Sequence, residues 1–269
     1  GQAQVVNGEL ILTEQFYQNE DDMELAGRWR FYRNELLSPQ EPRPEGKPNF
    51  EYLSTPWSEL PGNSRFKQAK GYATYELDIF STRASEDLAL RIPEFYSAYD
   101  LYLNGELVSK NGEVGEDISS VKPYWLPHIK AISLREGQNR LVLRVANFHH
   151  FKGGAVAPIS IGNARTFFFY KNLAVSASLF IAGALLISAV FSLIVYYFQR
   201  LDFTFLFYGL FALSYIYRVI GTDTYILHEI FDGLSWHVAI RLEYLSLFLS
   251  VIFFTYFYHD ISYFFHLFR

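Results

Sequence analysis

The sequence predicts an all-β jelly-roll sandwich followed by an α-helical bundle with about three transmembrane spans. Three observations predict this fold class: charge is concentrated in the first two-thirds of the chain, long apolar stretches fill the last third, and short alternating segments separated by turns occupy the first part. Residues 1–172 carry 41 charged side chains, whereas residues 173–269 carry 10. We therefore expect the two parts to lie in water and in lipid, respectively.

Four segments of the first part alternate between apolar and polar residues, as half-buried β-strands do. They are 72–79, 88–92, 97–103 and 140–145. Asn104-Gly105 follows the third segment and is typical of a type I′ hairpin turn, which needs positive φ at both central residues. Short strands separated by such turns favour a jelly-roll sandwich over residues 1–165.

The last third contains three candidate membrane spans, at about 173–199, 203–222 and 236–258. Residues 173–199 hold no charge over 27 positions, which corresponds to a helix of about 40 Å against about 30 Å of hydrocarbon. The second and third spans have uncharged cores of 15 residues each, and we expect their flanking arginines to reach the interface. Residues 221–235 are expected to form a polar turn, and residues 166–172 a stalk without a flexible Gly/Ser linker.

Charge near the spans predicts the orientation of the chain. The loop between the first two spans contains Arg200, whereas the loop between the second and third contains no Lys or Arg. The positive-inside rule therefore places residues 1–172 outside. The start GQAQVV resembles the mature end that signal-peptide cleavage leaves, which also favours export of this domain.

Arg218 and Glu243 are charged residues expected near the outer ends of the second and third spans. One interpretation is interfacial snorkelling, in which each side chain reaches the headgroup region. The other is an Arg218–Glu243 ion pair that ties the two helices together.

A resemblance to a known family rests on five short runs of sequence. They are LAGRWRF at 25–31, TPW at 55–57, GYATY at 71–75, YDLYLNGE at 99–106 and GQNRLVLRVAN at 137–147. Together they resemble the sugar-binding jelly roll at the N terminus of family 2 β-glycosidases. The resemblance implies a carbohydrate-binding-like domain.

Such a domain followed by RLDFTFLFYGLFALSYIYRVIGTDTYI at 200–226 resembles the bacterial seven-transmembrane receptors with diverse intracellular signalling modules. This resemblance implies a protein of the bacterial inner membrane whose residues 1–172 are periplasmic or extracellular. It also implies that residues 173–269 are the first part of a longer bundle, with a cytoplasmic signalling domain beyond them.

Sugar sites combine flat aromatic faces with carboxylates and amides that pair with hydroxyl groups. Candidate ligand-binding residues lie near the expected loops, and Trp125, His149 and His150 lie in segments of poor strand character, where a rigid sandwich displays function. The candidates are Glu94, Tyr96, Trp125, Asn147, His149 and His150. Trp125 has an alternative role as an anchor for loop packing, and Trp29 and Trp57 are expected in the core.

The sequence argues against catalysis and against several ligand classes. It has no cysteine, and it has no Gly-x-Ser-x-Gly motif, P-loop or dinucleotide fingerprint. His149 and His150 are adjacent, so on a strand they would point to opposite faces rather than to one metal ion. The net charge of −5 argues against nucleic-acid binding. We therefore expect no catalytic residue, cofactor or metal in this chain.

The leading functional hypothesis is the ligand-sensing part of a bacterial envelope receptor, which binds a carbohydrate or similar polar ligand outside and passes the signal through its membrane helices. The alternative is a non-catalytic envelope component whose β-sandwich docks another protein and whose helices anchor it in a larger complex. The expected partners are membrane lipid, a carbohydrate ligand, and a membrane-complex partner or a second copy of the chain.

Overall fold

The structure is a computed structural model of the chain. It describes residues 5–19, 22–44, 46, 48–59, 69–95, 97–150, 153–155, 157–199, 202–222, 225–230 and 236–267. The chain separates into two compact units, residues 1–169 and 170–269. The first is called the β unit and the second the helical unit.

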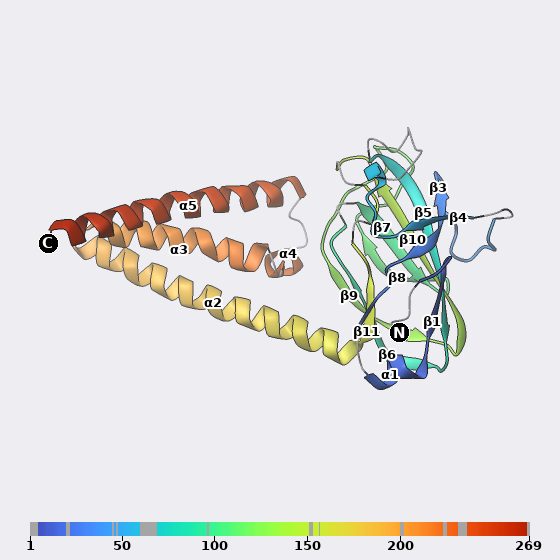
Figure 1. The fold of residues 1–269 in the computed structure, drawn as a ribbon. Coiled ribbons are helices and arrows are strands. Elements are labelled where there is room, and N and C mark those ends of the chain that lie inside the picture. Colours follow the sequence, from blue (N-terminus) through green and yellow to red (C-terminus); the bar gives the residue numbers. More distant parts are fainter. Residues whose placement is uncertain are drawn as a thin grey trace. The chain divides into compact units, whose positions relative to one another are not determined.

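The β unit contains two sheets of mainly antiparallel strands (Figure 1). One sheet has seven strands in the order β4-β3-β5-β10-β7-β8, with β1 paired in parallel to β5, and the other has four in the order β2-β11-β6-β9. The strands are β1 Glu9–Leu12, β2 Met23–Glu24, β3 Arg28–Arg33, β4 Asn49–Tyr52, β5 Gly71–Ser81, β6 Ser85–Ile92, β7 Ala98–Leu103, β8 Glu106–Asn111, β9 His128–Leu134, β10 Gly137–Asn147 and β11 Ser160–Asn163. A short helix, α1 (Glu14–Asn19), and a 3₁₀ turn at Trp57–Glu59 complete the unit.

The four strands predicted from alternation are confirmed as β5, β6, β7 and β10. The strands β5, β6 and β10 are a few residues longer than the predicted segments, and β7 matches its segment to within one residue. The extra length arises because alternation marks burial, whereas strand pairing continues past the buried positions. Asn104 and Gly105 have φ values of 52° and 86°. Positive φ at both residues is what the predicted tight turn between β7 and β8 requires.

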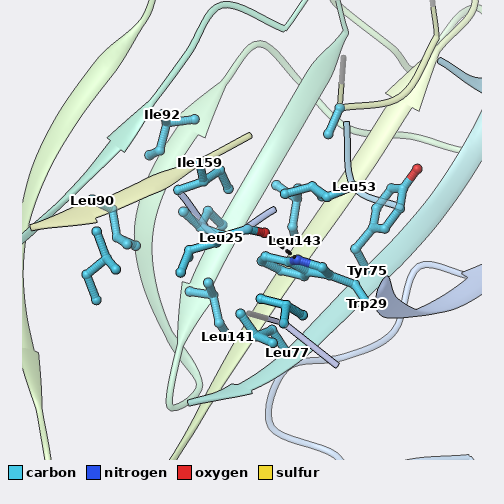
Figure 2. Packing of buried hydrophobic residues seen from close by; sticks show 14 of the residues in the cluster. Leu25, Trp29, Leu53, Tyr75, Leu77, Leu90, Ile92, Leu141, Leu143 and Ile159 are labelled. Carbon is cyan, nitrogen blue, oxygen red and sulfur yellow. Dashed lines mark hydrogen bonds between the residues drawn. The ribbon is translucent and has the colours of Figure 1, made fainter. Parts of the chain in front are cut away.

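The inward faces of the two sheets share one hydrophobic core (Figure 2). Trp29 is fully buried within it, and its Nε1 donates a hydrogen bond to the carbonyl oxygen of Leu25 at 2.9 Å. Trp57 is also fully buried, and its Nε1 donates to the hydroxyl of Tyr75 at 2.7 Å. The prediction that Trp29 and Trp57 belong to the core is confirmed, and both indole N–H groups have partners there.

The helical unit holds most of three helices that are long and apolar enough to cross a membrane: Ala164–Gln199, Phe203–Gly221 and Arg241–Ser262. The first two are α2 and α3 in Figure 1, and the third is part of α5, which spans Trp236–Leu267. The short helix α4, Ile226–Ile230, lies where the sequence predicted only a polar turn.

α2 begins nine residues before the expected start at Leu173, so the predicted stalk at 166–172 is helical. The charged side chains of Arg165 and Lys171 mark the edge of the apolar stretch. They do not end the helix, because both residues are good helix formers. A helix starts where its backbone is capped, and that point lies at Asn163.

Helices α3 and α5 pack against each other through aromatic rings. Phe207 stacks on Tyr256 with ring centroids 5.0 Å apart, and Phe211 contacts Phe254 at 5.5 Å. Gly209 of α3 lies against Leu193 of α2. A small residue at this position lets the two helix backbones approach closely.

Candidate functional site

Strand register brings the candidate ligand-binding residues to one end of the β unit. Ala146 of β10 pairs with Ala98 of β7, and Ile92 of β6 pairs with His128 of β9. The segments after β6 and β10 and before β7 and β9 therefore meet at one end, which we call the loop end. The structure places Glu94, Trp125, Asn147, His149 and His150 there, whereas Tyr96 lies outside the described residues.

Trp125 is buried, with 6% of its surface exposed, and its ring centroid lies 5.2 Å from that of Tyr124. A sugar platform needs an open aromatic face, whereas a buried ring anchors the loop that carries it. Of the two roles considered for Trp125, loop packing matches this burial. Tyr124 is half-buried beside it.

Asn147 holds the turn after β10. Its Nδ2 donates hydrogen bonds to the carbonyl oxygens of Ala69 at 2.6 Å and His150 at 2.8 Å, and its Oδ1 accepts from the backbone N–H of His150 at 3.0 Å. These bonds engage the side-chain amide with backbone groups. His149 is exposed, and Glu94 and His150 are half-buried. The histidines and Glu94 are therefore the more accessible members of the predicted set.

A polar cluster that the sequence analysis did not identify lies between the sheets at the loop end. The Oγ of Ser109 lies 2.9 Å from Nδ1 of His128, and the hydroxyl of Tyr99 lies 3.1 Å from the same nitrogen and 3.2 Å from Ser109 Oγ. Burial raises the pKa of the Tyr99 hydroxyl above its usual value. The cluster therefore keeps a neutral phenol that can donate and accept hydrogen bonds at physiological pH.

Asn111 extends this polar cluster. Its side chain is 1% exposed, its Nδ2 donates to the carbonyl oxygen of Leu126 at 3.4 Å, and its Oδ1 has no hydrogen-bond partner among the described residues. We call Tyr99, Ser109, Asn111 and His128 the inner polar cluster. Alternation along β8 places Ser109 and Asn111 on the buried side, and two polar residues at inward positions are the sequence signal that could have identified it.

A second polar group lies on the outward face of the seven-stranded sheet. Glu76 and Asp78 of β5 are buried, and both pair with Arg43, at 2.8 Å and 2.5 Å. Arg140 also pairs with Glu76, and Arg30 pairs with Asp78 at 2.9 Å.

This group fastens residues 34–44 across the sheet. Besides the contacts of Arg43, the side chain of Gln40 donates to the carbonyl oxygen of Gly105 at 2.9 Å, and Arg140 donates to that of Glu41 at 2.7 Å. Burial, followed by the charge of Glu76, raises the pKa of Tyr32, whose hydroxyl donates to that carboxylate at 3.3 Å. Because the arginines and carboxylates satisfy one another, this group ties residues 34–44 to the sheet and offers little to a ligand.

Among the residues that the structure describes, no three His, Cys, Asp or Glu side chains gather closely enough to hold a metal ion. The described parts of the helical unit contain an ion pair between Lys171 Nζ and Glu229 Oε1 at 2.7 Å. Arg218 of α3 and Glu243 of α5 are both described, and the interhelical ion pair considered for them from the sequence stays a prediction. The charged link that the structure shows lies between α2 and α4.

The junction between β11 and α2 is continuous and packed. β11 ends at Asn163 and α2 begins at Ala164, and Asn163 Oδ1 accepts a hydrogen bond from the backbone N–H of Thr166 at 3.2 Å. This bond is an N-cap. The side chain of Phe167 is buried over Gly162. On the same ring, the guanidinium of Arg91 lies 4.9 Å from the centroid.

These features define the chain as a two-sheet β unit joined to helices that are long and apolar enough to cross a membrane. No protein-family model and no curated protein sequence matches it.

Solved structures that resemble part of the chain are family 2 glycosidases. They include a β-galacturonidase from Eisenbergiella tayi bound to galacturonate, with 12% identity and a TM-score of 0.37 over 53% of this chain and 24% of that one. A β-glucuronidase from Faecalibacterium prausnitzii has 12% identity and a TM-score of 0.40 over 53% and 31%, and one from an uncultured Clostridium species has 16% and 0.41 over 52% and 28%. The chain thus covers less than a third of each glycosidase, and such distant likeness carries no argument about its activity.

Proposed function

We propose that this chain is the ligand-sensing part of a bacterial envelope receptor. Its β unit is a jelly-roll sandwich on the periplasmic or extracellular side of the inner membrane, where it binds a carbohydrate or a similar polar ligand. Its helices form the first part of a seven-transmembrane bundle that passes the signal inward.

The observation that carries this proposal is the uninterrupted passage from β11 into α2. Ser160 pairs with Arg91 near the loop end, and Asn163 pairs with Leu88 farther from it. The last strand of the β unit thus runs away from the loop end and becomes a helix that is apolar enough to cross a membrane. Because no flexible linker intervenes, a change in the pose of the β unit would act on that helix directly.

Ligand binding can drive such a change only if the ligand binds two poses of the receptor with different affinities. The loop end supports ligand binding with accessible polar groups at its surface, such as His149 and Glu94, and with the inner polar cluster beneath. Its hydroxyl, amide and imidazole groups both donate and accept hydrogen bonds. Such groups suit a ligand rich in hydroxyls.

A glycan array probed with the full chain in lipid nanodiscs tests this function. We expect binding to at least one glycan class and loss of binding in His149→Ala and Trp125→Ala. Tyr52→Ala is the matched control because Tyr52 is an exposed aromatic residue paired with Arg28, at the end of β3 away from the loop end.

Because Trp125 is buried, the exposed His149 provides the variant least affected by misfolding. Absence of glycan binding together with co-purification of a stoichiometric protein partner would contradict ligand sensing. It would favour the alternative, in which the β unit docks another protein and the helices anchor it in a larger membrane complex.

A further inference from the structure

A row of polar side chains crosses the outward face of the seven-stranded sheet. Asp100 of β7 pairs in register with Lys110 of β8 and with Arg144 of β10, and Arg144 pairs with Thr74 of β5. These positions share a face because directly opposed residues in paired strands point to the same side. The core residues Tyr99 and Leu101, next to Asp100 in sequence, point to the other side.

Asp100 and Arg144 face each other without forming a hydrogen bond. Their closest charged atoms, Asp100 Oδ2 and Arg144 Nη2, are 4.0 Å apart, beyond hydrogen-bonding distance. Asp100 is 8% exposed, and neither its Oδ1 nor Nε of Arg144 has a hydrogen-bond partner among the described residues. Buried polar groups are normally paired, so this row retains unused capacity to donate and accept.

Thr74, the neighbour of Arg144 on β5, is already engaged with backbone groups. The hydroxyl of Thr74 donates to the carbonyl oxygen of Glu35 at 2.7 Å and accepts from the backbone N–H of Leu37 at 3.0 Å. Toward the loop end, the sheet is covered by a small apolar cluster that includes Ala98, Val121 and Ala146. Asp100 and Arg144 therefore border two covered parts of the face.

We propose that Asp100 and Arg144 form a binding site for a hydroxyl group of a polyhydroxylated ligand. This inference rests on the proposed function and assigns to these two residues a contact that is separate from the loop end. Tyr102 lies on the same face, and the Arg144 guanidinium is 5.9 Å from the centroid of its ring. The aromatic ring gives the site an apolar wall beside its charged groups.

The separation of the two charged groups favours a hydroxyl over a carboxylate or an ammonium group of a ligand. A hydroxyl oxygen placed about 2.8 Å from both atoms can donate its proton to the carboxylate and accept a proton from the guanidinium. A second carboxylate could pair only with Arg144, and an ammonium group only with Asp100. A single hydroxyl can bridge Asp100 Oδ2 and Arg144 Nη2 across their gap of 4.0 Å.

The protonation behaviour of Asp100 agrees with this geometry. Burial raises the pKa of its carboxyl, and the positive charges of Arg144 and Lys110 oppose that rise. A hydrogen bond from a ligand hydroxyl to the carboxylate would favour the ionised form further. Ligand binding would thus relieve part of the cost of burying this charge.

Saturation-transfer NMR on the full chain in nanodiscs tests the site with four neutral probes: glycerol, myo-inositol, D-mannitol and D-glucose. We expect at least one probe to bind the wild-type chain, and we expect Asp100→Asn and Arg144→Lys each to weaken that binding about tenfold or more. Matched controls are Asp87→Asn and Arg135→Lys, which change exposed residues outside the row and should bind as wild type does.

Near-UV circular dichroism checks that each variant keeps its fold. Lys110 is exposed, so Lys110→Gln carries little risk of misfolding, and we expect it to weaken probe binding less than the other two variants do. The proposal is overturned if no probe binds the wild-type chain, or if Asp100→Asn and Arg144→Lys bind as the controls do. If the loop-end variants Trp125→Ala and His149→Ala lose glycan binding while Asp100→Asn does not, the receptor function stands and this site is wrong.

Discussion

At the scale of single residues, the β unit depends on charges that are buried and neutralised. Glu76 is fully buried between Arg43 and Arg140, which also hold residues 34–44 against the sheet. Removing one partner of a buried ion pair leaves the other uncompensated, and this costs more than the pair itself contributes. Glu76 therefore matters more to stability than a surface carboxylate does.

We expect Glu76→Gln to lower the free energy of unfolding by about 1–3 kcal/mol, because Arg140 loses its counter-charge while Arg43 keeps Asp78. Denaturant titration of the full chain, followed by the fluorescence of buried Trp29 and Trp57, measures the change. The control is Glu113→Gln, which breaks the exposed pair with Lys122 and should leave the midpoint unchanged. Equal midpoints for the two variants would contradict this role of Glu76.

At the scale of elements, the junction of β11 with α2 is the feature with functional consequences. Asn163 caps the helix, and Phe167 packs into the β unit one turn later. The beginning of α2 is thus held by contacts within the β unit rather than by the apolar sequence that follows. This arrangement makes the start of α2 responsive to small movements of β11.

We expect Gly162→Ala to loosen this junction, because a Cβ atom there would lie 2.8 Å from Phe167 Cζ and 3.1 Å from Asp22 Cβ. Overpacking of this kind costs about 1–3 kcal/mol. Hydrogen exchange should become faster at residues 164–169. The control is Gly183→Ala, farther along α2, where a Cβ would meet nothing within 4 Å and exchange at 164–169 should not change. Equal exchange in both variants would argue against the packed junction.

At the scale of the whole molecule, the chain is divided into a charged β unit and helices that are long and apolar enough to cross a membrane. Residues 1–172 carry most of its charge and contain both sheets, whereas the three apolar helices carry large exposed side chains such as Phe180, which is 78% exposed. Apolar surface of this extent along a helix is stable in hydrocarbon rather than in water. The receptor proposal further requires the β unit to lie outside the cytoplasm.

The absence of cysteine from the chain makes that orientation measurable with single substitutions. We expect a membrane-impermeant maleimide to label Ile118→Cys in intact cells, because Ile118 lies in an exposed loop of the β unit. Gln199→Cys, at the end of α2, should react only after the cells are permeabilised. The opposite labelling pattern would place the β unit in the cytoplasm and exclude an external ligand.

Local patterns in the sequence determined the strands, the tight turn at Asn104-Gly105 and the apolar helices. Alternation, turn chemistry and hydropathy act over a few neighbouring residues, so each can be recognised without knowing the fold. The sequence also indicated that the candidate ligand-binding residues would lie near loops, whereas their gathering at the loop end follows from the strand register. It left open whether Trp125 is a ligand platform or a packing anchor, and it did not indicate that Asn147 would bond to backbone carbonyls.

Only the tertiary structure decided which polar residues meet. Ser109 and His128 are far enough apart in sequence that their contact depends on how β8 and β9 pack, and Asp100 meets Arg144 because β7 pairs with β10 in one register. Likewise, the true start of α2 depends on a cap and on Phe167 packing into the β unit. Contacts between distant segments follow from strand pairing and burial, which no local pattern specifies.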